Sequence, residues 1–404
     1  MLSVSEALES ILKEFQPVEA ESVPLELSSG RVLAEDIAAG HPLPLFDNSS
    51  VDGFALLAGD ASPGRALRVV DDLRAGDVGR KTLRSGECAR IMTGAALPPG
   101  ADAVIMVEDT DFNERAPGSR APERVTLNKA IEPGENVRRR GMDVQAGETL
   151  LRAGSRLRAQ DAGLLAMLGI GRAPVRRKPR LALLSSGNEL LPPGAPPEPG
   201  RVWDANSTVL GSLAEEAGMQ LIRLGVAADD EADVRARLER AVQAQADVIV
   251  SSAGVSVGAF DFVKTVIEQQ GELDFWKVDM RPGKPLAFGR YRSIPFFGLP
   301  GNPVSAFIGF EVFVRPALDK LSGAPFEPRP RRRARLLEEV RSDGRESYLR
   351  AIAGVERGEL VVCLTGHQGS GNLLSLVQSN ALLILPSGVK SVPAHSEVDI
   401  WTLS

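Results

Sequence analysis

Short apolar runs alternate with amphipathic stretches in the second half of the chain, and this alternation constrains the fold more than any other feature. The runs LALLSS (181–186), LIRLGVA (221–227) and DVIVSS (247–252) are separated by stretches with helical spacing of apolar residues. Strands that alternate with helices predict a parallel sheet with right-handed crossovers. We therefore expect an α/β domain over residues 174–324, closed by a long helix (302–321) that bends near Pro316.

The remaining chain predicts smaller, less regular regions. Residues 3–15 have helical spacing, with Ser3 or Ser5 as the N-cap, and residues 66–130 carry short β-like runs between turn residues. The fold class is therefore multidomain α/β plus β, with a central parallel-sheet domain between an N-terminal mixed region and a small C-terminal β-barrel. The domains that we expect beside the α/β domain are a discontinuous N-terminal α+β linker domain (1–40 and 142–173), a small β domain (41–141) and a C-terminal β-barrel domain (325–404).

Composition excludes several classes of protein. A chain of 404 residues is too long for one core, and 47 Lys and Arg against 53 Asp and Glu give a net charge of -6, which disfavours a nucleic-acid binder. The Arg-rich stretch 329–335 lacks interleaved aromatic residues and is expected to be a solvated linker. The N-terminus lacks a signal-peptide pattern and no apolar run reaches about 18 residues, so we expect a cytoplasmic protein without a membrane span. Cys88, Cys363 and three scattered histidines predict inert buried thiols and no structural zinc.

Three loops of small and polar residues follow apolar runs of the predicted α/β domain. They are LLSSGNEL (183–190), SSAGVSVGAFDFV (251–263) and GLPGNPVSA (298–306). Ligands of open parallel sheets bind at the carboxyl ends of the strands, and glycine lets backbone N–H groups approach an oxyanion. The loops match neither the P-loop nor the dinucleotide pattern, so the sequence predicts phosphate contacts without naming a nucleotide fold. The expected contacts are Gly187, Ser251, Gly254, Ser256, Gly258, Pro300, Gly301, Asn302 and Pro303.

Four carboxylates accompany these loops, namely Glu189, Asp229, Asp230 and Asp261. Acids beside phosphate-binding loops commonly hold Mg²⁺, whose ligands are oxygen atoms. Helix capping is the alternative for Asp229, Asp230 and Asp261, each of which precedes a predicted helix.

The segment RPGKP (281–285) presents two cations on a stiff backbone. Its two prolines hold Arg281 and Lys284 at low entropy cost, which suits a small dianion. A plain turn would also use Pro-Gly, so the segment alone leaves both interpretations open.

Together, these motifs resemble one family. SSGNEL, SSAGVSVGAFDFVK, RPGKPLAFG and GLPGNPVSA occur in this order, after FDNSSVDGFAL, RIMTGAALPPGADAVIMVED, ENVRRRGMDV and AGLLAMLGI, and before TGHQGSGNLLSL and NALLILP. They resemble the molybdopterin molybdenumtransferases, the MoeA family, which is related to the E domain of gephyrin and of its plant counterpart. The resemblance runs from about residue 3 to the end of the chain.

The resemblance implies the last step of molybdenum cofactor biosynthesis, carried out by a homodimeric transferase. Molybdate would be inserted into adenylylated molybdopterin in a Mg²⁺-dependent step that releases AMP, at a site where the MogA-like α/β domain of one subunit meets β domains of the other. A molybdopterin adenylyltransferase would be the pathway neighbour. The alternatives are that the chain is itself such an adenylyltransferase, which shares the α/β module, or a non-catalytic gephyrin-like scaffold.

The resemblance also implies residue roles. Asp261, Lys284, Glu189 and Asp52 would be catalytic. Arg281, Arg350 and Ser370 would contact molybdate or the pterin phosphate, and Thr93, Arg138 and Asp143 match N-terminal motifs that face the site across the dimer. A structural alternative exists for Asp52, which precedes Gly53 in a turn, and for Thr93, which precedes Gly94.

The chain departs from the family pattern at three positions. Asn188 stands where the family usually has an acid, which removes one negative charge beside Glu189. Arg281 stands where lysine is common and presents a planar fork instead of a point charge. Ala253 replaces a glycine, so the backbone there must tolerate a methyl group.

Overall fold

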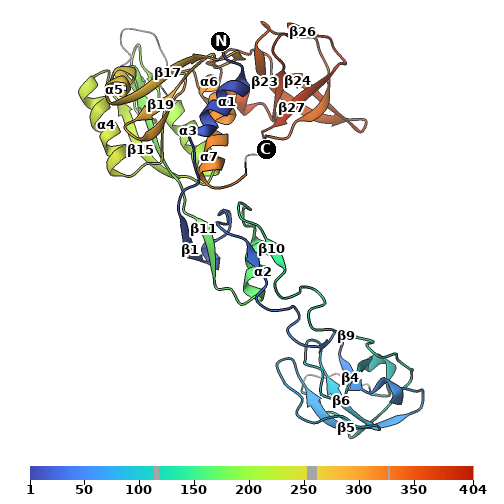
Figure 1. Ribbon diagram of the computed structural model, residues 1–404. Helices are drawn as coiled ribbons and strands as arrows, with labels where there is room; N and C mark the ends of the chain where they lie inside the picture. Colours follow the sequence, from blue (N-terminus) through green and yellow to red (C-terminus); the bar gives the residue numbers. More distant parts are fainter. Residues whose placement is uncertain (113–117, 253–261, 326–327, 404) are drawn as a thin grey trace. The chain divides into compact units, whose positions relative to one another are not determined.

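The computed structural model describes residues 1–112, 118–252, 262–325 and 328–403, and the chain divides into two compact units (Figure 1). The first unit contains Met1–Glu35, Gly154–Ala162 and Arg172–Ser404, and the second contains Asp36–Ala153 and Gly163–Gly171. Each unit has hydrophobic cores of its own. The finer domain boundaries expected from the sequence stay predictions.

The first unit begins with α1 (Val4–Lys13), which confirms the predicted N-terminal helix. Ser3 is its N-cap: the Ser3 hydroxyl accepts from the Glu6 N–H at 3.2 Å, and the Ser3 N–H donates to Glu6 Oε2 at 2.8 Å. This reciprocal capping box satisfies two backbone donors that a helix start leaves unpaired. Val4, Ala7 and Ile11 lie on one buried face, and α1 contacts α7 (Arg315–Leu321).

The central sheet has the order β15-β12-β16-β20-β19-β17. β15, β12, β16 and β20 pair in parallel as predicted, whereas β19 and β17 pair antiparallel. The prediction of a parallel sheet is therefore wrong for β19, which runs against both of its neighbours, β20 and β17. The link between β19 and β20 is two residues long, which suits a hairpin and is too short for a crossover. The strands are β12 (Arg180–Ser186), β15 (Gln220–Ala227), β16 (Val248–Ser251), β17 (Gly271–Lys277), β19 (Pro285–Tyr291) and β20 (Ile294–Gly298), with a short pair β13 (Leu190–Leu191) and β14 (Val202–Trp203) beside them.

Helices cover both faces of this sheet (Figure 1). Successive side chains of β12 point to opposite faces, so Leu181 and Leu183 join one core while Ala182 and Leu184 join the other. The first core is formed with α1, α3 and the last helices of the domain, and the second with α4 and α5. The predicted helices are present as α3 (Ala205–Glu216), α4 (Glu231–Gln243) and α5 (Phe262–Gln270).

The last helix of the α/β domain is interrupted. It runs as α6 (Pro303–Gly309), a π-helical segment (Phe310–Val314) and α7. Pro316 has no N–H to donate to the carbonyl four residues earlier, and its ring crowds that carbonyl. The irregularity expected near Pro316 therefore occurs in the turn before the proline, where the wider π-helix accommodates it.

A closed β-barrel follows, as predicted. Its strands pair in the order β23-β24-β21-β27-β25, and the pairing of β23 with β25 closes the ring. The Arg-rich stretch is not a solvated linker, because Arg332–Leu336 forms β21 and buries Ala334 and Leu336 inside the barrel. The elements are β21, β22 (Val340–Arg341), β23 (Glu346–Glu356), β24 (Glu359–Leu364), α8 (Leu374–Val377), β25 (Ala381–Leu385), β26 (Ser391–Val392) and β27 (Glu397–Thr402), and β18 (Met280–Arg281) pairs with β23.

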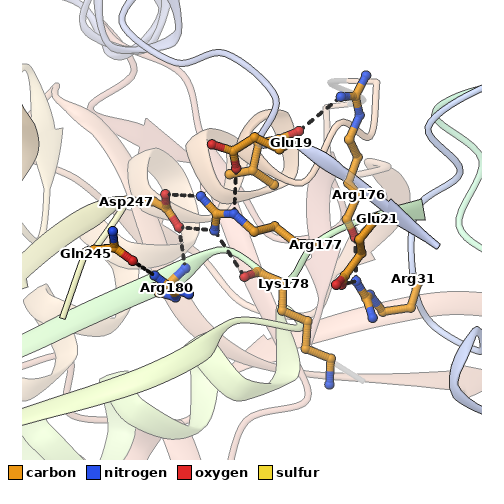
Figure 2. Close-up of polar contacts among 10 residues, drawn as sticks. Glu19, Glu21, Arg31, Arg176, Arg177, Lys178, Arg180, Gln245 and Asp247 are labelled. Carbon is orange, nitrogen blue, oxygen red and sulfur yellow. Dashed lines mark hydrogen bonds and ion pairs between the residues drawn. The ribbon is translucent and has the colours of Figure 1, made fainter. Parts of the chain in front are cut away.

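A polar cluster fixes the point where the chain enters the central sheet (Figure 2). The ribbon of β1 (Ala20–Pro24) and β11 (Arg172–Arg176) ends at Arg177, which donates to both oxygens of Asp247 at 2.7 and 2.6 Å and to Glu19 at 2.6 Å. Asp247 also accepts from the Arg180 N–H at 2.7 Å. The carboxylate of Asp247 thus joins the start of β12 to the turn before β16, and its hydrogen bonds raise the pKa of Arg177.

The second unit is built on a sheet of order β7-β4-β6-β5-β8, in agreement with the predicted small β domain. Gly53 opens β4, and a Cβ there would lie 1.9 Å from the Ile105 carbonyl oxygen of β7, so only glycine fits. Cys88 is fully buried in the core, and burial raises the pKa of its thiol to about 12, as expected for an inert cysteine. Cys363, on β24 of the barrel, is only half-buried. The second unit's elements are β2 (Ile37–Ala38), β3 (Asn48–Ser49), β4 (Gly53–Leu56), β5 (Ala66–Leu73), β6 (Glu87–Ile91), β7 (Ala103–Met106), β8 (Arg124–Thr126), β9 (Val137–Arg138) and β10 (Thr149–Leu151), and α2 (Ala159–Met167) follows.

Throughout the described ranges, no helix has both the length and the apolar character needed to cross a bilayer.

Candidate functional site

The predicted loops meet at one edge of the central sheet because β12, β16 and β20 are parallel neighbours. The hydroxyls of Ser185 and Ser252 are 3.0 Å apart, and the Leu299 N–H donates to the Ser251 carbonyl at 2.8 Å. Asn206 at the start of α3 donates to the Gly301 carbonyl at 2.8 Å. The ends of the three loops therefore lie side by side, while Gly254, Ser256, Gly258 and Asp261 fall outside the described residues.

The first loop is folded tightly around Gly187. A Cβ at Gly187 would lie 2.3 Å from Glu189 Oε2, and the φ of Gly187 is +141°, so only glycine suits this position. Asn188 donates its backbone N–H to Asp229 Oδ2 at 3.1 Å, and its side-chain Oδ1 accepts from the Asp229 N–H at 3.2 Å. This reciprocal pair holds Glu189 and Asp229 on neighbouring loops.

The carboxylates divide into two kinds. Asp230 caps α4, since its side chain accepts from the Asp233 N–H at 2.9 Å, so the capping alternative is confirmed for this residue. Glu189 and Asp229 offer hard oxygen donors of the type that Mg²⁺ prefers. No group of three or more His, Cys, Asp or Glu suited to a metal occurs among the described residues, which do not include Asp261.

A cavity of about 370 Å³ lies where RPGKP, α6 and the barrel meet. Arg281, Lys284, Arg350 and Ser370, which the sequence predicted as oxyanion contacts, all line it. Its described lining also includes Arg345 and contains no carboxylate. Arg345 is paired with Asp343, which lies outside the lining, so Arg281, Lys284 and Arg350 are the cations that suit a compact anion here.

The cavity is connected to the sheet edge through the third loop. The Val304 N–H at the start of α6 donates to the Ser370 carbonyl at 3.1 Å, and Ser305 lines the cavity. Asn302 is the N-cap of α6 and Pro303 its first residue. The phosphate-loop residues Pro300 to Pro303 thus lead directly into the cationic cavity.

Arg350 is the most constrained of the four cations. Its side chain is fully buried on β23, where Nε donates to Ser375 Oγ at 2.9 Å and Nη2 donates to the Gly369 carbonyl at 3.0 Å. Burial, followed by repulsion from Arg281, lowers the pKa of Arg350 to about 10. In the described chain no carboxylate forms an ion pair with Arg350, so a cation is held here among neutral groups.

Sequence reasoning missed three polar residues of the cavity lining, Arg345, Gln368 and Ser305. Gln368 and Ser305 belong to the motifs TGHQGSG and GLPGNPVSA, so their position in those motifs was the available signal. Arg345 carried no such signal. It is held by Asp343, two residues earlier, at 2.5 Å and by the Met280 carbonyl at 3.0 Å, and the second contact depends on the pairing of β18 with β23.

The second unit contains the other predicted site residues. Asp52 Oδ1 accepts from both the N–H and the hydroxyl of Thr93, at 2.7 and 2.8 Å. Arg138 and Asp143 form an ion pair with each other. Asp52 therefore holds Thr93, a contact that the sequence did not predict, and a role of these residues toward a partner's site stays a prediction.

A larger cavity of about 1100 Å³ lies between α1, α7 and the barrel. It is lined by none of the predicted site residues, and its lining contains carboxylates, among them the buried Glu311, which forms ion pairs with Arg315 and Arg329. We therefore place the candidate site at the smaller, carboxylate-free cavity and the adjoining sheet edge.

An α/β sheet with small polar loops at its carboxyl edge, joined to a β-barrel across a cationic cavity, defines a multidomain protein that binds phosphorylated or oxyanionic ligands. Three family models match the chain: the MoeA N-terminal region (domain I and II) at residues 2–169, a probable molybdopterin binding domain at 182–320, and the MoeA C-terminal region (domain IV) at 333–403. The chain belongs to the MoeA family.

Relatives and solved structures agree with this family over the full chain. The chain is 35% identical to a molybdopterin molybdenumtransferase of Haemophilus influenzae, over 99% of this chain and 98% of the relative. It is 36% identical to molybdopterin molybdenumtransferase 2 of Mycobacterium tuberculosis, over the whole of both chains. A crystal structure of a molybdopterin biosynthesis MoeA protein from Pyrococcus horikoshii OT3 covers 100% of both chains with a TM-score of 0.81 and 32% identity. The family and the fold class predicted from the sequence are confirmed.

Proposed function

We propose that this chain is a transferase of molybdenum cofactor biosynthesis that inserts molybdenum into molybdopterin. Its relatives carry that name over the full chain length. Molybdate is the metal source, and adenylylated molybdopterin is the acceptor, whose phosphoanhydride bond to AMP is cleaved with release of AMP. The observation that carries the proposal is the cavity in which Arg281, Lys284 and Arg350 gather without a carboxylate in the described lining.

The cavity and the sheet edge divide the substrates between them. Molybdate is a tetrahedral dianion, and charge-assisted hydrogen bonds from Arg281, Lys284 and Arg350 suit its oxygen atoms. The loops at Gly187, Ser251 and Pro300–Pro303 present backbone N–H groups and hydroxyls to the phosphates of the adenylylated pterin. Since the third loop joins the cavity at Ser370, both substrates are held within reach of each other.

Glu189 and Asp229 are the described residues that would hold Mg²⁺, with Asp261 as a further ligand and catalytic acid. When bound, Mg²⁺ supplies positive charge to the phosphate oxygens of the bond that breaks. Asp230 contributes less directly, because its side chain caps α4. Asp52 is proposed to act toward the site of a partner subunit in a cytoplasmic homodimer, and a molybdopterin adenylyltransferase supplies the adenylylated substrate. The family resemblance is the support for these parts.

The test uses the purified full chain with adenylylated molybdopterin, molybdate and Mg²⁺. We expect AMP release, measured by chromatography, together with formation of cofactor that activates a molybdoenzyme apoprotein. Absence of both would refute the proposal, and AMP transfer from ATP to molybdopterin would favour the adenylyltransferase alternative.

Matched lysine variants localise the activity. Lys284→Ala should raise the KM for molybdate by about tenfold or more, because a charge-assisted contact is lost. Lys277→Ala removes an exposed lysine outside the described cavity lining and should leave the KM unchanged. Equal effects of the two substitutions would contradict the placement of the site.

A further inference from the structure

The side-chain hydrogen bonds of the buried cation Arg350, and those that side chains make to its backbone, all come from one segment of the described barrel, residues 365–375. Buried arginines are rare unless a carboxylate pairs with them, because the desolvated charge is costly. Within the described chain, the hydrogen-bond partners of the Arg350 side chain and backbone amide are neutral, namely Ser375, Gly369 and Gln368. The segment thus replaces a counter-ion with uncharged dipoles.

Gln368 holds the Arg350 backbone from both sides. Its Oε1 accepts from the Arg350 N–H at 2.9 Å, and its Nε2 donates to the Arg350 carbonyl at 3.0 Å and to Thr365 Oγ1 at 3.3 Å. The Gln368 side chain therefore holds the Arg350 backbone in place, and Gln368 also lines the cationic cavity.

Ser375 orients the guanidinium itself. Its buried hydroxyl donates to the Asn372 carbonyl at 2.6 Å, which leaves a lone pair to accept from Arg350 Nε at 2.9 Å. The Gly369 carbonyl accepts from Nη2 at 3.0 Å. Nη1 donates to no residue in the described part of the chain, so the arginine keeps donor capacity for a ligand in the cavity that it lines.

We propose that Gln368 and Ser375 are positioning residues that hold Arg350 as a buried cation with neutral partners, so that its charge is reserved for the substrate oxyanion. This inference rests on the proposed function and describes how the protein positions one cation of the proposed oxyanion site. An internal carboxylate at the same place would pair with Arg350 and compete with the incoming dianion. Arg281 repels Arg350, and Arg350 lacks a counter-ion among the described residues. Both effects favour binding of a dianion, whose negative charge would stabilise the two cations.

Gln368→Glu is a test of this role, because glutamate has the shape of glutamine, adds a negative charge and replaces the Nε2 donor with a second carboxylate oxygen. We expect molybdate binding to the full chain, measured by titration calorimetry, to weaken by about tenfold or more. The midpoint of thermal unfolding without ligand should fall less than in Gln368→Met, since the added negative charge near the buried cation offsets part of the lost donor bonds. The KM for molybdate should rise more than kcat falls.

Two further variants separate positioning from simple structural support. Gln368→Met removes the hydrogen bonds without adding charge, and it should lower the unfolding midpoint while weakening molybdate binding less than Gln368→Glu does. Ser375→Ala should weaken binding by releasing Arg350 Nε, and Ser375→Thr, which keeps the hydroxyl, should restore it.

The outcomes distinguish this inference from the proposed function. Wild-type protein that binds no molybdate would refute the oxyanion site and with it the proposed function. Wild-type protein that binds molybdate, with Gln368→Glu binding equally well or losing stability together with affinity as Gln368→Met does, would overturn the positioning role alone.

Discussion

Replacing Arg350 with methionine should stabilise the unliganded protein while destroying its affinity for molybdate. Methionine retains much of the length of the arginine stem and removes the charge. The pKa of Arg350 is lowered to about 10. Relative to an ordinary arginine, this corresponds to about 3 kcal/mol against the charged form in the folded state.

The hydrogen bonds of Arg350 partly offset this penalty. The side chain donates to Ser375 and to the Gly369 carbonyl, and a typical net contribution is about 1 kcal/mol for each bond. The Arg350→Met variant should therefore gain about 1 kcal/mol in the free energy of unfolding at neutral pH. Because the folded-state pKa is lower than the unfolded-state pKa, the penalty of the wild type is fully present below about pH 10 and declines as the pH rises from there to the unfolded-state pKa.

Urea unfolding near neutral pH (about 7.5), followed by circular dichroism with and without molybdate, measures the effect of the substitution on the free energy of unfolding. Arg341→Met is the matched control, since Arg341 lies exposed in the same barrel, and its stability should change by less than about 0.5 kcal/mol. Wild-type stability should rise when molybdate is added, whereas Arg350→Met should not respond. A loss of more than about 2 kcal/mol in Arg350→Met, with molybdate still bound, would refute the reasoning.

Three further predictions concern stability and reactivity. Asp247→Ala removes the acceptor of three hydrogen bonds at the entry to the central sheet and should lower the free energy of unfolding by about 2–3 kcal/mol. An unchanged molybdate affinity in calorimetry would show that the effect is structural. Gly53→Ala should destabilise the second unit by more than about 2 kcal/mol, because the new Cβ meets the Ile105 carbonyl, and a wild-type melting curve would contradict this. Cys88 should stay unmodified by a thiol reagent at about pH 8 until the protein unfolds, because the thiol is buried and its pKa is about 12. Mass spectrometry measures the labelling, and rapid labelling of the folded protein would show that the thiol is not buried.

Local patterns of residues determined much of the fold. The spacing of apolar residues predicted α1 and the strand–helix alternation from β12 to α5, because hydrophobic periodicity is a property of neighbouring residues. Ser3 and Glu6 form a capping box within one helical turn, which is equally local. The prolines of RPGKP marked Arg281 and Lys284 as a stiff cationic segment, and both residues line the cavity.

Only the tertiary structure decided what depends on residues distant in the chain. The antiparallel pairing of β19 with both β20 and β17 depends on contacts at the sheet edge, since the same apolar run can form a strand in either direction. The Arg-rich stretch contains the barrel strand β21, which pairs with β24 and β27 and buries Ala334 and Leu336 in the barrel core. Arg350 illustrates the limit most clearly. The local sequence predicts only that Arg350 lies on a strand. Its neutral hydrogen-bond partners come from the segment 365–375, and its lowered pKa reflects burial and the nearby Arg281, so its electrostatic character depends on residues distant in the chain.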